Sequence, residues 1–333
     1  MKRVQKTHLK VSLNIVSGWK KQTSMEERLM HILGVDVNKC NGCGECVTEC
    51  PPRLFYQHEA EGKATYEEGI RICILCGHCI AVCPMDAVLF ETKESDPVLE
   101  FDSQKSKSSD IITPDQLMYL FRMRRSVRRF KDESLSFDDV QSVLDAMRYA
   151  PTAKNLQALQ YLVLSDKAVI KMLADKVLSF LRMTMRVSDT PGIGWVFRAI
   201  LKDARLLKDP MVKEDMNRLF EGQDRGVDEL FYDAPAVVIV HTRDTLGMGR
   251  NETGIAVAHG MIAAEVLGLG TCWIGYAQKV MNNSGGVRKA AGIPSGHIVT
   301  GVFVVGHPHV RYYRAPPRNA VKPTYVMNGW EPL

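Results

Sequence analysis

Two cysteine runs with the same spacing constrain this chain more than any other feature. The first extends from Cys40 to Cys50 and the second from Cys73 to Cys83, and both have the pattern C-x2-C-x2-C-x3-C-P. This spacing lets three thiolates wrap one iron–sulfur cube while the fourth points away from it. Gly42, Gly44 and Gly77 allow tight turns between the cysteines, and the proline after each run stops a helix from continuing. The duplicated spacing therefore indicates iron–sulfur ligation.

Zinc ligation and a disulfide framework both fit these cysteines poorly. A zinc site usually has paired ligands separated by a longer loop, and disulfides need an oxidising compartment. The runs resemble those of the bacterial ferredoxin with two [4Fe-4S] clusters, a family in which the fourth cysteine of each run serves the other cluster. That resemblance implies one ligand set of Cys40, Cys43, Cys46 and Cys83, and another of Cys73, Cys76, Cys79 and Cys50.

Length and charge narrow the class of protein. A chain of 333 residues is too long for one compact core, and we expect two domains of unequal size. Residues 1–24 hold six basic and no acidic side chains, and subtracting them from the net charge of +5 leaves −1. The sequence therefore gives little support for nucleic-acid binding. No apolar run reaches the length of a membrane helix, and we expect a cytoplasmic protein.

We expect four segments along the chain. Residues 1–30 form a basic leader, either disordered or upstream of a later start at Met25 or Met30, because they lack the continuous apolar region of a signal peptide. Residues 31–95 form the ferredoxin-like domain, with a hairpin between the cysteine runs. Residues 96–112 have the composition of a linker, and residues 113–333 form the large domain.

The large domain has the pattern of an α+β fold. Helices are expected after Thr113, from Ser136 to a point before Pro151, and over 253–267. Strands are expected at 161–164, 236–241 and 297–306. The elements alternate too irregularly for a doubly wound sheet. His259 falls on the apolar helix and is expected in the core, while 180–230 has uncertain helical patterning.

Four short stretches of the large domain contain clustered arginine, hydroxyl, amide or glycine residues. Arg124–Phe130 offers several cationic donors and a hydroxyl, although taken alone it would be a solvated helix end. Ala150–Gln157 would be an ordinary helix-ending loop. Leu267–Gly275 is rich in glycine, which permits close backbone approach to a ring, and Gly306–Arg318 contains further arginines. An incomplete G-x-G-x-x-G in the third stretch excludes a dinucleotide fingerprint.

These four stretches, in this order, resemble the nitroreductase family of FMN enzymes. The resemblance implies a central mixed or antiparallel sheet flanked by helices and a homodimer with FMN at its interface. It also implies FMN contacts from Arg124, Arg125, Ser126, Arg128, Thr152, Asn155, Gln157, Trp273, Ile274, Gly275, Arg314 and Arg318. One departure is Ala158-Leu159, which replaces the family's Pro-Trp. Cys272 is expected to be a small buried residue and not a nucleophile.

The two resemblances together predict an iron–sulfur flavoprotein oxidoreductase. Electrons would pass through two [4Fe-4S] clusters to FMN and then to a small organic acceptor such as a nitroaromatic, a quinone or an enone. Reduced ferredoxin or NAD(P)H would be the donor, and residues 180–230 would cap the flavin. The alternative is an electron carrier or redox sensor in which FMN relays electrons to a protein partner. The sequence assigns no acid or base.

Overall fold

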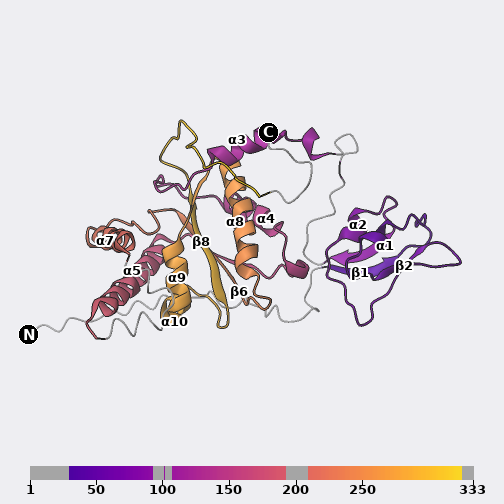
Figure 1. Ribbon diagram of the computed structural model, residues 1–333, viewed down its shortest axis with the longest axis horizontal. Helices are drawn as coiled ribbons and strands as arrows, with labels where there is room; N and C mark the ends of the chain where they lie inside the picture. Colours follow the sequence, from indigo (N-terminus) through magenta and orange to yellow (C-terminus); the bar gives the residue numbers. More distant parts are fainter. Residues whose placement is uncertain (1–29, 93–100, 102–106, 193–208, 325–333) are drawn as a thin grey trace, which may run out of the picture. The chain divides into compact units, whose positions relative to one another are not determined.

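The computed structural model describes residues 30–92, 101, 107–192 and 209–324, and the chain divides into two units, Met1–Glu100 and Phe101–Leu333 (Figure 1). The expected leader, apart from Met30, and most of the expected linker lie outside the described residues. The bounds of the four segments therefore stay a prediction. No helix in the described part of the chain is long and apolar enough to cross a membrane.

In its described residues, 30–92, the first unit has two antiparallel strand pairs and two short helices. Strand β1 (Met30–Val35) pairs with β4 (Val88–Thr92), and β2 (Phe55–Gln57) pairs with β3 (Ala64–Tyr66) as the expected hairpin. Each cysteine run contains one helix, α1 (Glu45–Glu49) or α2 (His78–Ala81). Gly44 and Gly77 precede these helices with φ of 75° and 73°, a left-handed conformation that glycine adopts without strain.

The second unit is built on a four-stranded antiparallel sheet in the order β5-β6-β8-β7. The strands are β5 (Gln160–Leu164), β6 (Ala236–Thr242), β7 (Gly270–Trp273) and β8 (Ile298–Gly306). Every residue of β6 is buried, because alternate side chains pack into two different apolar layers. Val237 and Ile239 belong to one layer, and Val238 and Val240 to the other. A strand covered on both faces must be apolar along its whole length.

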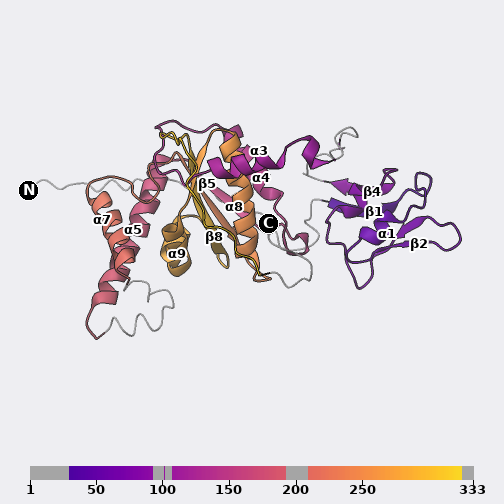
Figure 2. The same ribbon diagram turned by 45° about the horizontal axis from the view of Figure 1, so that its top comes forward.

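Helices cover both faces of this sheet, as Figures 1 and 2 show. One face carries α4 (Phe137–Arg148) and α8 (Gly249–Val266), and the other carries α5 (Lys167–Asp189), α9 (Gly275–Asn283) and α10 (Gly285–Ala290). Helix α7 (Pro210–Asp224) packs against α5, and α3 (Pro114–Met123) packs against α8. Two single 3-10 turns are η2 (Ser108–Asp110) and η3 (Ala153–Asn155). The expected α+β class, with a sheet flanked by helices, is confirmed.

The predicted helix starts follow from their caps. The Thr113 hydroxyl accepts from the Gln116 N–H at 3.2 Å, and the Ser136 hydroxyl accepts from the Asp139 N–H at 3.0 Å.

The prediction for His259 was wrong: this side chain is exposed on α8, on a different side of the helix from Gly260. A Cβ at Gly260 would lie 2.6 Å from Met147, so glycine lets α8 approach α4 closely.

Candidate functional site

Cysteines from both runs line a common pocket in the first unit. Cys40, Cys43 and Cys46 of the first run meet Cys83 of the second, and apolar side chains of β1, β3 and β4 complete the wall. Cys46 is buried by its place on α1. Burial raises the pKa of its thiol above the ordinary value, and Cys40, Cys83 and Cys43 raise it further. Four thiol groups thus surround one small space.

The remaining four cysteines of the runs form a second group. Burial raises the pKa of the Cys79 thiol to about 12, and the neighbouring thiols of Cys73, Cys76 and Cys50 contribute to this shift. The outgoing cysteine of each run therefore lies with the first three cysteines of the other run. This is the exchange that the ferredoxin resemblance implied. Gly42, between Cys40 and Cys43 of the first group, lies close to the hairpin, because a Cβ on it would be 2.7 Å from the Gly62 carbonyl oxygen.

Backbone amides point at the sulfur atoms of both groups. The Leu54 N–H donates to Cys50 Sγ at 3.3 Å, the Leu75 N–H to Cys73 Sγ at 3.3 Å, and the Ala87 N–H to Cys83 Sγ at 3.2 Å. Such donors stabilise thiolates, which are the form that binds iron. In the described residues no three His, Cys, Asp or Glu side chains could hold one metal ion. The first thiol set surrounds a space instead, and that arrangement fits a cluster.

The second unit contains an arginine-lined pocket of about 310 Å³. We call it the arginine pocket, and its lining residues are Arg124, Arg125, Ser126, Arg128, Tyr312 and Arg318. Five of these six were expected from the sequence, and Tyr312 was missed because nothing in its local sequence marks it. Arg314, which was also expected near a phosphate, is exposed and is not among the residues that line this pocket.

Backbone pairing holds the 124–130 segment, which supplies most of the lining of the arginine pocket, against β7 and the segment after β8. Ser126 forms a parallel bridge with Thr271 of β7, and the Val127 N–H donates to the Thr271 carbonyl at 2.9 Å. Farther along, Phe130 forms an antiparallel bridge with Pro308 after β8. Gly270 makes the first contact possible, because a Cβ there would lie 2.7 Å from Val127. The 124–130 segment is thereby fixed between β7 and the segment that follows β8.

The half-buried Glu265 and the buried Cys272 lie near the arginines. Burial raises the pKa of the Glu265 carboxyl on α8, while Arg124 and Arg125 act in the opposite direction. Cys272 is buried as expected, with 3% of its surface exposed. Burial raises its thiol pKa, and the nearby Arg128 partly offsets this. A concentration of guanidinium groups in a partly desolvated pocket is suited to a phosphate or carboxylate.

The loop with Thr152, Asn155 and Gln157 is held by contacts to its own chain. The Gln157 N–H donates to Thr152 Oγ1 at 3.0 Å, and the Ala153 N–H donates to Glu252 Oε1 at 2.8 Å. Asn155 and Gln157 have φ of 50° and 47°, in the left-handed region. None of the three expected residues lines the arginine pocket. Glu252, a buried carboxylate in the first turn of α8, was not expected to have this role.

Trp273, Ile274 and Gly275 connect β7 to α9. The Ile274 N–H is already used, since it donates to the Val302 carbonyl at 2.7 Å. Gly275 is the first residue of α9, a position at which an N–H has no partner within its own helix. The Trp273 indole N–H donates to Gln278 at 3.0 Å, and 37% of this side chain is exposed. Gly275 is therefore the residue of the three whose amide suits a ligand acceptor.

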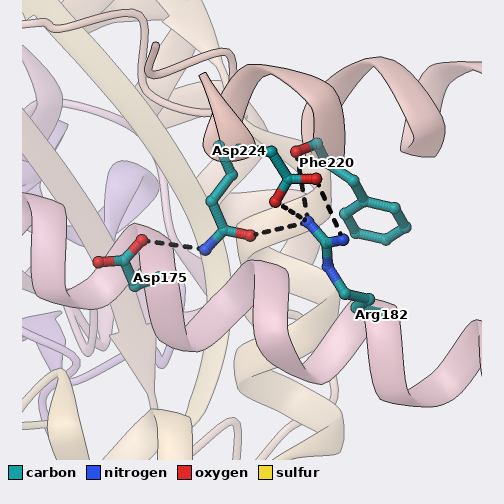
Figure 3. Close-up of polar contacts among 5 residues, drawn as sticks. Asp175, Arg182, Phe220 and Asp224 are labelled. Atoms are coloured by element: carbon teal, nitrogen blue, oxygen red, sulfur yellow. Dashed lines mark hydrogen bonds and ion pairs between the residues drawn. The ribbon is translucent and has the colours of Figure 1, made fainter. Parts of the chain in front are cut away.

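Helices α5 and α7 account for much of the 180–230 segment and are joined by a polar clamp (Figure 3). Arg182 on α5 donates to Asp224 Oδ1 at 2.9 Å and to the Phe220 carbonyl at 3.3 Å, with its guanidinium 4.6 Å from the Phe220 ring centre. Gln223 links the two helices again by donating to Asp175 at 3.0 Å. Residues 193–208 lie outside the described part of the chain.

Comparison with known families accounts for both units. The chain matches the Nitroreductase family over residues 121–307 and the 4Fe-4S dicluster domain over residues 26–87. An uncharacterized ferredoxin of Methanocaldococcus jannaschii is 33% identical over 57 residues, which are 17% of this chain and 74% of that protein. The archaeal polymerase subunit Rpo3 of Methanosarcina acetivorans is 32% identical over 72 residues, 22% of this chain, and the chain spans only 27% of its length.

Two similarities concern the large domain. A protein of Archaeoglobus fulgidus, provisionally named NADH dehydrogenase/NAD(P)H nitroreductase, is 22% identical over 194 residues, which are 58% of this chain and 86% of that protein. A nitroreductase of Bacteroides fragilis, solved with bound FMN, has a TM-score of 0.48 at 19% identity, covering 64% of this chain and 99% of the other.

Proposed function

Because the chain belongs to the nitroreductase family and carries a 4Fe-4S dicluster domain at its N-terminal end, we propose that it is an FMN-dependent oxidoreductase supplied with electrons through iron–sulfur clusters. The arginine pocket is the observation that carries this proposal. It is a preformed anion site on the domain that matches the family. The acceptor is a small organic molecule of the nitroaromatic, quinone or enone class.

The arginine pocket holds the FMN phosphate. Arg124, Arg125, Arg128 and Arg318 supply guanidinium donors, and Ser126 supplies a hydroxyl. Trp273, Ile274 and Gly275 contact the ring, with the Gly275 amide as the donor. Arg314 contributes from the exposed side of the same segment. When bound, FMN can take up single electrons and deliver two, whereas each cluster carries one electron at a time.

The two groups of thiols each hold one [4Fe-4S] cluster. Cys40, Cys43, Cys46 and Cys83 surround the first. Cys50, Cys73, Cys76 and Cys79 surround the second. Amide donors to Cys50, Cys73 and Cys83 lower the electron density on the ligand sulfurs and support the reduced clusters. Thiolate ligands require a reducing compartment, which we take to be the cytoplasm.

The active form is a homodimer, and two exposed apolar faces support it. Helix α3 has no buried residue, and Leu117, Tyr119 and Phe121 are all exposed. Helix α8, against which α3 packs, exposes the apolar side chains of Ile255 and Val266. An apolar helix face is normally packed against another element. A second copy covers these faces, and its Thr152–Gln157 loop reaches the FMN.

Cofactor content and turnover test the proposal together. Protein purified without oxygen should release close to one FMN per chain and should reduce a nitroaromatic or quinone with stoichiometric consumption of donor. Full cofactor content with donor oxidation only in the presence of a protein partner would favour an electron carrier. Absence of FMN from protein that retains its iron would contradict the proposal.

A further inference from the structure

The indole of Trp273 is held at two points by neighbouring elements. Its N–H donates to Gln278 Oε1 on α9 at 3.0 Å. The edge of its six-membered ring faces Gly301 of β8, where a Cβ would lie only 3.1 Å from Trp273 Cη2. Trp273 is the last residue of β7 and is 37% exposed. A large ring is therefore partly accessible from outside, while contacts at both of its ends set its orientation.

Gln278 is fixed in turn by the backbone of β8. Its amide nitrogen donates to the Thr300 carbonyl at 2.7 Å, so the amide oxygen is left for the Trp273 N–H. The pairing of β8 with β6 shifts register here and passes over Thr300. A bulge of this kind leaves one residue outside the ladder, and its carbonyl can accept from a side chain. The bulge thus determines which way round the Gln278 amide lies.

The side chain of Thr300 is fixed from helix α8. Thr253 Oγ1 donates to Thr300 Oγ1 at 2.6 Å, and the Thr300 hydroxyl donates to the Val240 carbonyl at 3.3 Å. Both threonines are buried. Contacts from α8, β6 and α9 therefore converge on Thr300, and Gln278 transmits this fixed position to the Trp273 indole.

The same helix carries a matched amide that bonds to β8 without contacting the indole N–H. Asn282 Nδ2 donates to the Val299 carbonyl at 2.6 Å, and the Val299 N–H donates to Asn282 Oδ1 at 2.9 Å. Asn282 lies about one turn after Gln278 on α9 and bonds to the residue that precedes Thr300. Both amides anchor α9 on β8, whereas the amide oxygen of Gln278 is the one bonded to Trp273.

We propose that Gln278 is a positioning residue, which holds the Trp273 indole in one orientation beside the FMN ring. Without a partner for its N–H, the indole can populate other rotamers, and its contact with the ring is then averaged over them. Gln278 acts through Trp273 and is not a catalytic residue. This inference rests on the proposed function, in which Trp273 and Gly275 contact the ring.

The test measures FMN binding and the visible circular dichroism of bound FMN, with full-length protein that carries its clusters. The difference between FMN-saturated and FMN-free protein removes the contribution of the clusters. Gln278→Met keeps the length of the side chain and removes both amide bonds, so the flavin bands should weaken clearly. The Kd for FMN should rise by up to roughly 10-fold, as loss of one neutral hydrogen bond implies.

Asn282→Leu is the matched control, because it also removes two hydrogen bonds between α9 and β8. Both variants should lower the midpoint of thermal unfolding, but Asn282→Leu should leave the flavin bands and the Kd unchanged. A double-mutant cycle checks the route of the effect. Trp273→Phe has no indole N–H to hold, so adding Gln278→Met to it should change the flavin bands little further.

The outcomes separate this inference from the proposed function. If unmodified protein binds FMN and Gln278→Met changes the flavin bands no more than Asn282→Leu does, the positioning role is wrong and the proposed function stands. If unmodified protein binds no FMN, both are wrong. If Gln278→Met does not fold, Gln278→Glu decides, because it keeps an acceptor oxygen for the Trp273 N–H. Retained flavin bands in Gln278→Glu would support the positioning role, and lost bands would overturn it.

Discussion

Cys83 closes the second cysteine run, yet its side chain lines the same pocket as Cys46 of the first run. Cys50 has the reciprocal place beside Cys79. Neither thiol set is complete without a residue from the other run, so the two runs must fold as one unit. We therefore expect metal occupancy of the two thiol sets to be coupled.

Metal content tests the two thiol sets. Anaerobically prepared protein should contain about eight iron and eight acid-labile sulfide per chain, as two [4Fe-4S] clusters require. Cys46→Ser should remove at least half of both, because it breaks one set, whereas Cys272→Ser should leave the content unchanged. Zinc bound with negligible sulfide would contradict the assignment.

Loss of a pocket arginine should weaken FMN binding. Arg128→Ala removes a charge-assisted hydrogen bond of about 1.5–3 kcal/mol, which corresponds to roughly 10- to 150-fold in Kd. Equilibrium binding of FMN, followed by its fluorescence, measures this change. Arg243, exposed directly after β6, provides the control, and Arg243→Ala should bind FMN normally. If both variants bind FMN with equal affinity, the FMN phosphate does not bind in the arginine pocket.

A charge on α3 should separate the dimer. Phe121 is 46% exposed on a helix that buries none of its own residues, so Phe121→Glu should produce a monomer that has lost FMN affinity. The control is Met211→Glu, an equally polar change at an exposed residue of α7. Light scattering at micromolar concentration measures the mass. Native protein that is already monomeric would rule out the proposed interface.

The His241–His297 pair predicts a loss of stability in mild acid. Their Nδ1 atoms are 2.9 Å apart, and burial, followed by the neighbouring His297, lowers the pKa of His241 to about 4. The unfolded chain binds a proton at its ordinary pKa, so the stabilisation present above pH 6.5 is lost as the pH falls towards 4. The full effect is roughly 3 kcal/mol. Chemical denaturation between these pH values should show the slope, and His241→Asn should flatten it.

The sequence predicts the chemistry of the sites better than their assembly. The cysteine spacing is a local pattern that by itself indicates a cluster, whereas the Arg124–Arg128 segment indicates an anion site only together with the other stretches that resemble the family. The pairing of Val127 with Thr271, and the approach of Arg318 and Tyr312, depend on contacts between distant segments. No local pattern encodes these contacts, and for this reason Tyr312 was missed.

Burial on helices was harder to predict than burial in strands. The continuous apolar run at 236–241 was predicted to be a strand, and β6 (Ala236–Thr242) is one with every residue buried. Helix α8 is apolar on sides that this single chain leaves exposed, so the position of His259 was assigned wrongly. The short elements β7, α9 and α10 were not predicted, because their glycine-rich segments have too few residues to establish a period.

The most direct test of the account is the rate of FMN reduction through the clusters. Stopped-flow measurements without oxygen compare intact protein with Cys43→Ser/Cys76→Ser protein that retains FMN. We predict that reduced ferredoxin reduces FMN quickly in the intact protein and much more slowly in the variant, while any reduction by NADH or NADPH is the same in both. Fast reduction of both proteins by NADH or NADPH, with no advantage for reduced ferredoxin when the clusters are intact, would contradict it.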